Sequence, residues 1–256
     1  MNEVIPPSPI LPERPKRRRG IYLLPNLFTT AALFSGFYAI IKGMNHQFEA
    51  AAIAIFIAMI LDGIDGRVAR LTNTQSEFGA EYDSLSDLIS FGLAPALVMY
   101  TWTLSTLGKV GWLVAFIYTA ATALRLARFN VQIGKIDKAY FQGLPSPAAA
   151  AVMAGLVWFC DESHIEPNSI AYLSLLLTLG TGLLMVSNIR YRSFKDLNLK
   201  GKVPFFAILA IVLLFVVISS NPPTVLFGAF LIYALSGVVS SSLQLYRRRR
   251  AKTVSN

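Results

Sequence analysis

The chain has few cysteines, histidines and charged residues. Cys160 is the single cysteine among 256 residues, which excludes an intrachain disulfide and a cysteine-based metal site. His46 and His164 are too few and too far apart for a zinc motif. Charged residues make up only 14% of the chain, whereas a soluble domain carries about a quarter. Because hydrophobic residues make up 54%, we expect a one-domain membrane protein.

A net charge of +9 could indicate nucleic-acid binding, but the positions of the basic residues argue against it. They lie at the two ends of the chain and between apolar runs, without interleaved aromatic residues. This distribution is typical of cytoplasmic loops that contact anionic lipid. We therefore expect membrane lipid, and no nucleic acid, among the partners.

Eight apolar runs predict an all-α, polytopic fold with about eight transmembrane helices. Most runs are long enough to cross the hydrocarbon core as a helix of about 20 residues, although the fifth is short. No internal repeat of the kind common in secondary transporters is visible. The runs cover residues 24–42, 48–66, 84–106, 110–130, 146–160, 168–188, 203–220 and 224–245.

The basic residues also predict the orientation. With both termini in the cytoplasm, only Lys42 and Lys109 fall outside, while the other 21 of 23 basic residues lie inside. We predict a basic, proline-rich cytoplasmic segment over 1–20, a transmembrane catalytic domain over 21–246 and a basic cytoplasmic tail over 247–256. The membrane expected is a bacterial inner membrane, with the active site on its cytoplasmic side.

Four aspartates form the candidate active site. Asp62 and Asp65 share one helix face, as do Asp83 and Asp87, and the short connection between the two helices lets the pairs meet. Four carboxylates repel one another unless a cation neutralises them. Mg²⁺ or Mn²⁺ would suit oxygen ligands and would bring a phosphate-bearing substrate with it.

A solvated turn is the alternative interpretation of these aspartates. Asp62, however, directly follows the apolar residues 50–61, and an ionised group near the bilayer centre costs about 2.5–3.5 kcal/mol. Gly66 and Gly79 leave room for helices and substrate to approach, and Arg70 offers a cation to phosphate oxygens. These features favour a functional site.

The segment reads D-x2-D-G-x2-A-R-x8-G-x3-D-x3-D, which resembles the signature of the CDP-alcohol phosphatidyltransferase family. All eight fixed positions match: Asp62, Asp65, Gly66, Ala69, Arg70, Gly79, Asp83 and Asp87. The resemblance implies a core of six helices, a homodimer, and a reaction in which an acceptor hydroxyl displaces CMP from a CDP-linked lipid or alcohol.

The resemblance also implies roles for these residues. Asp62, Asp65 and Asp83 would ligate one or two metal ions. Asp87 would complete the metal cluster and act as the general base. The residues beside the CDP-lipid would be Gly66, Ala69, Arg70 and Gly79.

Three further segments, 25–29, 125–130 and 142–148, resemble the members of this family that form phosphatidylserine. They imply CDP-diacylglycerol and L-serine as substrates. A guanidinium can bind the serine carboxylate through two hydrogen bonds. The acceptor residues expected are Arg125, Arg128, Asn130 and Ser146.

Several alternatives stay open. Either arginine could instead be an anchor that reaches toward lipid phosphates. The acceptor could be glycerol 3-phosphate, an inositol phosphate or choline. A cation transporter would use the aspartates as an ion site, but it predicts carboxylates near the bilayer midplane rather than at the cytoplasmic edge. A scaffold without activity leaves the four aspartates unexplained.

Overall fold

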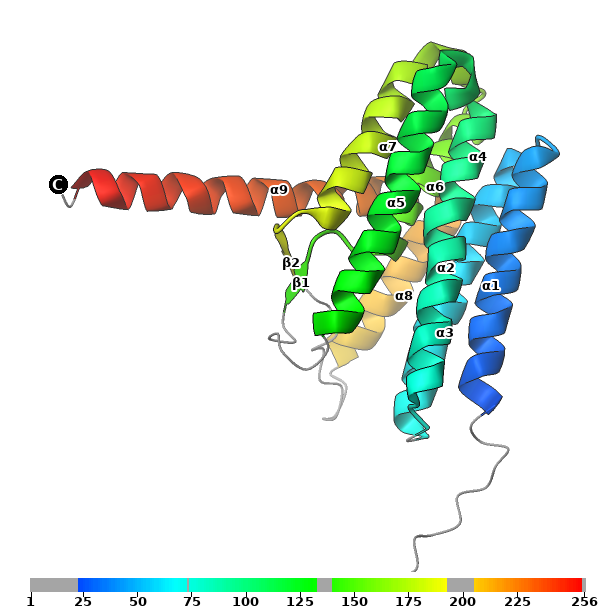
Figure 1. The fold of residues 1–256 in the computed structure, drawn as a ribbon, viewed down its shortest axis with the longest axis horizontal. Helices are drawn as coiled ribbons and strands as arrows, with labels where there is room; N and C mark the ends of the chain where they lie inside the picture. Colours follow the sequence, from blue (N-terminus) through cyan, green and yellow to red (C-terminus); the bar gives the residue numbers. More distant parts are fainter. Residues whose placement is uncertain (1–22, 73, 133–139, 193–204, 255–256) are drawn as a thin grey trace, which may run out of the picture.

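The computed structural model describes residues 23–72, 74–132, 140–192 and 205–254. Residues 1–20, for which a cytoplasmic segment is predicted, lie outside this range. The described chain is a bundle of long helices, with one helix that extends far to the side (Figure 1). The bundle contains α1 (Leu23–Met44), α2 (Phe48–Leu71), α3 (Glu77–Asp87), η2 (Leu88–Leu93), α4 (Ala94–Trp102), α5 (Lys109–Gln132), α6 (Ser146–Glu162) and α7 (Ala171–Val186).

The helices follow the predicted apolar runs, and the prediction of an all-α polytopic membrane protein is confirmed. Among the described residues, five helices are long and apolar enough to cross a membrane: Leu24–Met44, Glu77–Trp102, Lys109–Val131, Pro167–Val186 and Pro222–Ser242. The other three predicted spans correspond to α2, α6 and α8 (Phe205–Ser220). That these three also cross the membrane stays a prediction.

Small side chains let the central helices approach closely. Ala51, Ala54 and Ala58 of α2 are buried, and so is the run Ala148–Ala151 of α6. Between transmembrane helices, close van der Waals packing of this kind replaces the hydrophobic effect that drives association in water. The close approach of α2 to α6 fixes the direction of α2, whose later turns carry Asp62 and Asp65.

A π-helix connects α3 to α4 beside the aspartates. Pro95 has no backbone N–H, so it cannot donate to the carbonyl group of Phe91 four residues earlier. The chain widens over Leu88–Leu93, and the hydroxyl group of Tyr118 donates to the oxygen of Phe91 at 3.0 Å. This contact from α5 satisfies a buried carbonyl group one turn beyond Asp87.

A two-stranded ribbon, which the apolar pattern did not predict, lies at the end of the bundle near α5 and α7. Strand β1 (Tyr140–Gln142) pairs antiparallel with β2 (Arg190–Arg192). Gly143 follows β1 with φ of 80°, and an added Cβ atom would lie 2.1 Å from the oxygen of Met185. Only glycine fits this close approach of the ribbon to α7.

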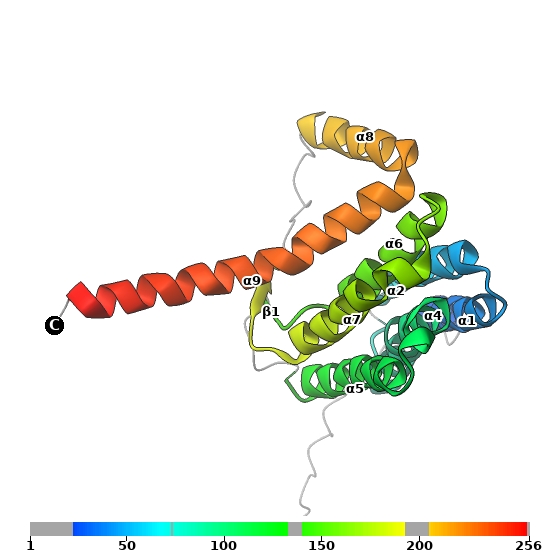
Figure 2. The ribbon, with the colours of Figure 1, turned by 90° about the horizontal axis from the view of Figure 1, so that it is seen from above.

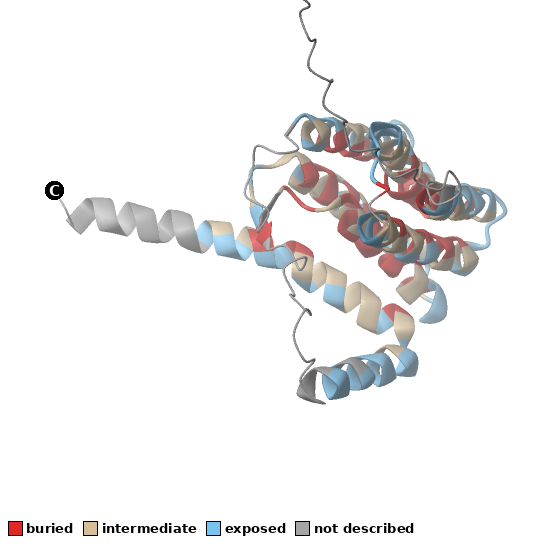
Figure 3. Cartoon of the chain, turned by 90° about the horizontal axis from the view of Figure 1, so that it is seen from below, coloured by how far each residue is buried: buried red, intermediate tan, exposed pale blue. Residues whose placement is uncertain are grey.

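Helices α8 and α9 (Pro222–Val254) lie to one side of the bundle. Helix α9 packs against α6 and β2 and separates α8 from the bundle (Figure 2). Buried residues concentrate in the bundle, whereas the described side chains of α8 are largely exposed (Figure 3). Exposed apolar residues on α8 such as Leu213, Phe215 and Val216 suit contact with lipid.

Candidate metal and acceptor site

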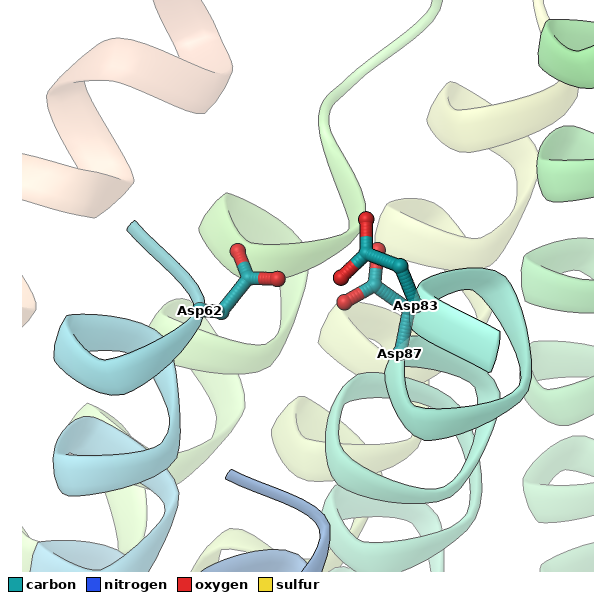
Figure 4. A group of neighbouring side chains, drawn as sticks. All are labelled: Asp62, Asp83 and Asp87. Atoms are coloured by element: carbon teal, nitrogen blue, oxygen red, sulfur yellow. The ribbon is translucent and has the colours of Figure 1, made fainter. Parts of the chain in front are cut away.

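Three of the four predicted aspartates meet in the structure. Asp62 extends from α2 toward Asp83 and Asp87, which lie one turn apart on α3 (Figure 4). Each offers a carboxylate oxygen, and the three oxygens lie within 4.8 Å of one another. All three residues are half-buried. The donor set consists only of oxygens with a negative charge, so it fits a hard divalent cation such as Mg²⁺ or Mn²⁺.

Asp65 lies outside this group of three. Its side chain is buried, and its Oδ2 accepts a hydrogen bond of 2.7 Å from the hydroxyl group of Thr29 on α1. A separation of three residues turns a side chain by about 60° from that of Asp62 around the helix. This offset directs Asp65 toward α1. A role for Asp65 as a metal ligand stays a prediction.

The glycines of α2 face open space. A Cβ atom added to Gly63 or Gly66 would meet nothing within 4 Å, so packing within the described chain does not require glycine at either position. Exposed Arg70 lies one turn beyond Gly66, next to half-buried Ala69. The end of α2 is therefore open for a ligand that also reaches the three carboxylates.

Gly79 has a different environment. Its backbone N–H donates to Oγ of Ser76, the N-cap residue of α3, at 3.0 Å. An added Cβ atom would lie 3.1 Å from the same oxygen. This capping contact begins the helix that carries Asp83 and Asp87.

Arg125 is buried, and it lies beside the carboxylate cluster. Its Nη1 donates to Oγ of Ser146, the first residue of α6, at 2.8 Å. The guanidinium also lies within electrostatic range of Asp87. Within the described part of the chain, its Nε has no hydrogen-bond partner. A buried guanidinium with an unused donor fits an anionic ligand that enters beside Asp87.

Arg128, one turn further along α5, donates from both terminal nitrogens to backbone oxygens. Its guanidinium donates to the backbone oxygens of Met185, Val186 and Ser187 and to that of Gln142, at distances of 3.0–3.4 Å. These contacts satisfy carbonyl groups at the end of α7 and connect them to β1. Arg128 therefore has a structural role in the described chain.

Asn130 joins α5 to the aspartate helix. Its Nδ2 donates to Oγ of Ser84 at 3.0 Å, and Ser84 lies between Asp83 and Asp87 in sequence. The sequence did not identify Ser84 or Tyr233 as residues near the site, and it singled out Thr29 only as part of the segment 25–29. Tyr233, on α9, lies within electrostatic range of Arg125. Ser84 could have been found from its position between two predicted ligands, whereas Tyr233 has no local signal.

Known proteins match almost the whole described chain. The family model for CDP-alcohol phosphatidyltransferase matches residues 22–240. The chain is 40% identical over 215 residues to the CDP-diacylglycerol–serine O-phosphatidyltransferase of Helicobacter pylori, a match that covers 84% of this chain and 90% of the relative. It is 42% identical over 184 residues to the protein of the same name from Mycobacterium bovis, covering 69% and 64%. The Bacillus subtilis protein of that name is 36% identical over 175 residues, covering 67% and 91%.

Proposed function

The chain belongs to the CDP-alcohol phosphatidyltransferase family, and we propose that it transfers the phosphatidyl group of CDP-diacylglycerol to the hydroxyl group of L-serine. The products are phosphatidylserine and CMP. The observation that carries this proposal is the 40% identity to a serine-using relative over 90% of that relative's length. The buried Arg125 beside the carboxylate cluster supports it, because serine brings a carboxylate that a guanidinium binds well.

The three clustered carboxylates would bind the donor substrate through a divalent metal ion. Asp62, Asp83 and Asp87, with Asp65 as the predicted fourth ligand, would hold Mg²⁺ or Mn²⁺, which neutralises charge on the diphosphate. Arg70 and the open face at Gly66 lie on the same helix end as Asp62, where the nucleotide diphosphate can approach. Half-burial of the cluster strengthens these electrostatic contacts relative to water.

Asp87 is the proposed general base. The serine hydroxyl oxygen attacks the phosphorus of the phosphatidyl group, and the bond from this phosphorus to the CMP oxygen breaks. The hydroxyl proton passes to the Asp87 carboxylate, and CMP leaves with the bonding electron pair. Arg125 lies within electrostatic range of Asp87, so it can hold the serine carboxylate while the serine hydroxyl reaches the base.

Arg125, rather than Arg128, is the proposed ligand of the serine carboxylate. The Nε of Arg125 lacks a partner in the described chain, and its Nη1 is fixed by Ser146. Arg128 already donates to four backbone oxygens. Asn130 supports the site indirectly through Ser84.

The proposed orientation places the aspartates and both termini on the cytoplasmic side of a bacterial inner membrane, with a homodimer as the assembly. The loop that contains Ser163 and His164 lies between α6 and α7. A cysteine at Ser163 should react with an impermeant maleimide from outside intact cells, whereas one before residue 14 should not. The opposite pattern would reject the orientation.

Purified protein incubated with CDP-diacylglycerol and single acceptors tests the function through CMP release. Release with L-serine supports the proposal. Release with glycerol 3-phosphate, an inositol phosphate or choline, but not serine, assigns another acceptor within the family. No release with any acceptor, together with ion flux in liposomes, would support the cation transporter.

A further inference from the structure

A wide helical turn directly follows the aspartates of α3. Asp87 precedes the π-helix η2, and the backbone N–H of Ala94 donates to the oxygen of Ile89, five residues earlier. An α-helix would make this bond over four residues, so η2 contains one extra residue. One residue corresponds to a rotation of about 100° around a helix. The π-helix therefore sets the direction of Asp83 and Asp87 relative to α4, which continues the same apolar span.

Helix α1 contacts this turn closely. The hydroxyl group of Ser90 donates to the backbone oxygen of Ala32 at 3.1 Å. One turn earlier, the hydroxyl group of Ser86 donates to the oxygen of Thr29 at 3.2 Å. A Cβ atom added to Gly36 would lie 2.7 Å from the Cα atom of Ser90, so the two backbones are nearly in contact. These contacts leave no room for the turn to move toward α1.

Helix α5 holds the next residues of the turn. The hydroxyl group of Tyr118 donates to the backbone oxygen of Phe91 at 3.0 Å, and both side chains are fully buried. In an α-helix this oxygen would accept from residue 95, but Pro95 has no N–H. A Cβ atom added to Gly92 would lie 3.1 Å from the Cβ atom of Thr122, one turn along α5. Tyr118 therefore supplies a donor that the helix itself lacks at position 95.

Resting on the proposed function, in which the carboxylate cluster binds metal, we infer that Tyr118 is a positioning residue for the metal site. Its hydrogen bond to the Phe91 oxygen maintains the wide turn of η2. The wide turn keeps Asp83 and Asp87 directed toward Asp62 (Figure 4), with carboxylate oxygens of the three within 4.8 Å of one another. Loss of the bond would let the chain relax toward an ordinary α-helix, which would turn both aspartates away from Asp62.

The test is Tyr118→Phe, which removes only the hydroxyl group. Binding of Mn²⁺ to the purified protein in detergent can be followed through the electron paramagnetic resonance signal of free Mn²⁺. We expect the Kd for Mn²⁺ to rise by at least about tenfold. A loss of this size is typical when a residue that orients metal ligands is removed.

Thr103→Val is the matched control. The Thr103 hydroxyl group donates to the backbone oxygen of Pro167 at 2.8 Å, and Thr103 follows α4, at the opposite end of the span from Asp83. Each of the two variants loses one hydrogen bond from a buried residue to a backbone oxygen, so both should lower the midpoint of thermal unfolding. Only Tyr118→Phe should weaken Mn²⁺ binding.

A double variant separates metal binding from stability. Pro95→Ala restores a backbone N–H that can donate to the Phe91 oxygen within an α-helix. Added to Tyr118→Phe, it should recover the midpoint of thermal unfolding, whereas Mn²⁺ binding should stay weak.

Unchanged Mn²⁺ binding in Tyr118→Phe, or equal weakening in Thr103→Val, would overturn the inference. Recovery of Mn²⁺ binding together with stability in the double variant would also overturn it. A wild type that releases CMP with another acceptor but not with serine would overturn the proposed function alone, because the Mn²⁺ comparison involves no acceptor.

Discussion

The hydroxyl group of Thr29 donates a hydrogen bond of 2.7 Å to Oδ2 of Asp65, which directs this carboxylate toward α1. The same hydroxyl lies 3.2 Å from the oxygen of Pro25. Asp65 therefore contributes to helix packing, whereas the family signature implies that it ligates metal. Substitution of each partner can separate these two roles.

If the Asp65 carboxylate is a metal ligand, Asp65→Asn should raise the Mn²⁺ concentration for half-maximal activity by at least about tenfold. A loss of metal affinity of this size is typical of weakened metal sites. Thr29→Val keeps the carboxylate, so this concentration should change less than about twofold. The valine variant should nevertheless lose about 1.5–3 kcal/mol of stability, because a buried hydrogen bond to a charged group is lost. If the activity of Asp65→Asn depended on Mn²⁺ concentration as that of the wild type does, Asp65 would not be a metal ligand and its role would be in helix packing alone.

Removal of divalent metal should abolish turnover. The oxygens of Asp62, Asp83 and Asp87 lie within 4.8 Å of one another, and this concentrated negative charge repels a diphosphate unless a cation neutralises it. CMP release should stop in excess EDTA and return when Mg²⁺ or Mn²⁺ is added above the chelator concentration. A metal-free control should retain its helical circular dichroism. Full activity in excess chelator would reject the metal assignment.

Asp87→Asn should separate chemistry from binding. The substitution removes the proposed proton acceptor, so kcat should fall by about 10²- to 10⁴-fold. Binding of CDP-diacylglycerol, measured as a shift in thermal unfolding in detergent, should largely remain, because Asp62, Asp83 and the predicted ligand Asp65 can still hold the metal. Asp62→Asn is the matched comparison and should weaken both binding and turnover. If Asp87→Asn lost nucleotide binding as severely as Asp62→Asn, the proposed division of roles would be wrong.

Much of the fold could be predicted from the sequence, because lipid requires long apolar helices and these leave continuous runs. The meeting of Asp62 with Asp83 and Asp87 followed from helical periodicity and a short connection. The direction of Asp65 did not, because it depends on Thr29 of a neighbouring helix. Nor did the position of α9, which depends on packing between residues distant in sequence. Periodicity contains no information about such contacts.

The role of Arg128 was likewise not predictable from the spacing of residues. Its partners are backbone oxygens at the end of α7 and at the last residue of β1. Every sequence offers backbone oxygens, so these partners leave no signal in the sequence. The strands β1 and β2 of the ribbon are too short to show an alternation of apolar and polar residues in the sequence. Two arginines one turn apart on α5 therefore look alike in sequence but have different surroundings in the structure.

The two arginines should respond differently to the same substitution. Arg125→Lys keeps the positive charge but loses the planar fork, so the KM for serine should rise about tenfold to a hundredfold, equivalent to about 1.5–3 kcal/mol. Arg128→Lys should leave this KM within about threefold. It should instead lower the midpoint of thermal unfolding, because the backbone oxygens of Met185, Val186 and Gln142 lose their donor.

Steady-state kinetics with serine and with serinamide, combined with unfolding in detergent, distinguish these outcomes. Serinamide has the hydroxyl group but no carboxylate, so Arg125→Lys should not alter its KM. The KM for CDP-diacylglycerol serves as an internal control in both variants, since neither arginine belongs to the carboxylate cluster. A large rise in the serine KM for Arg128→Lys, with unchanged thermal stability, would transfer carboxylate binding from Arg125 to Arg128.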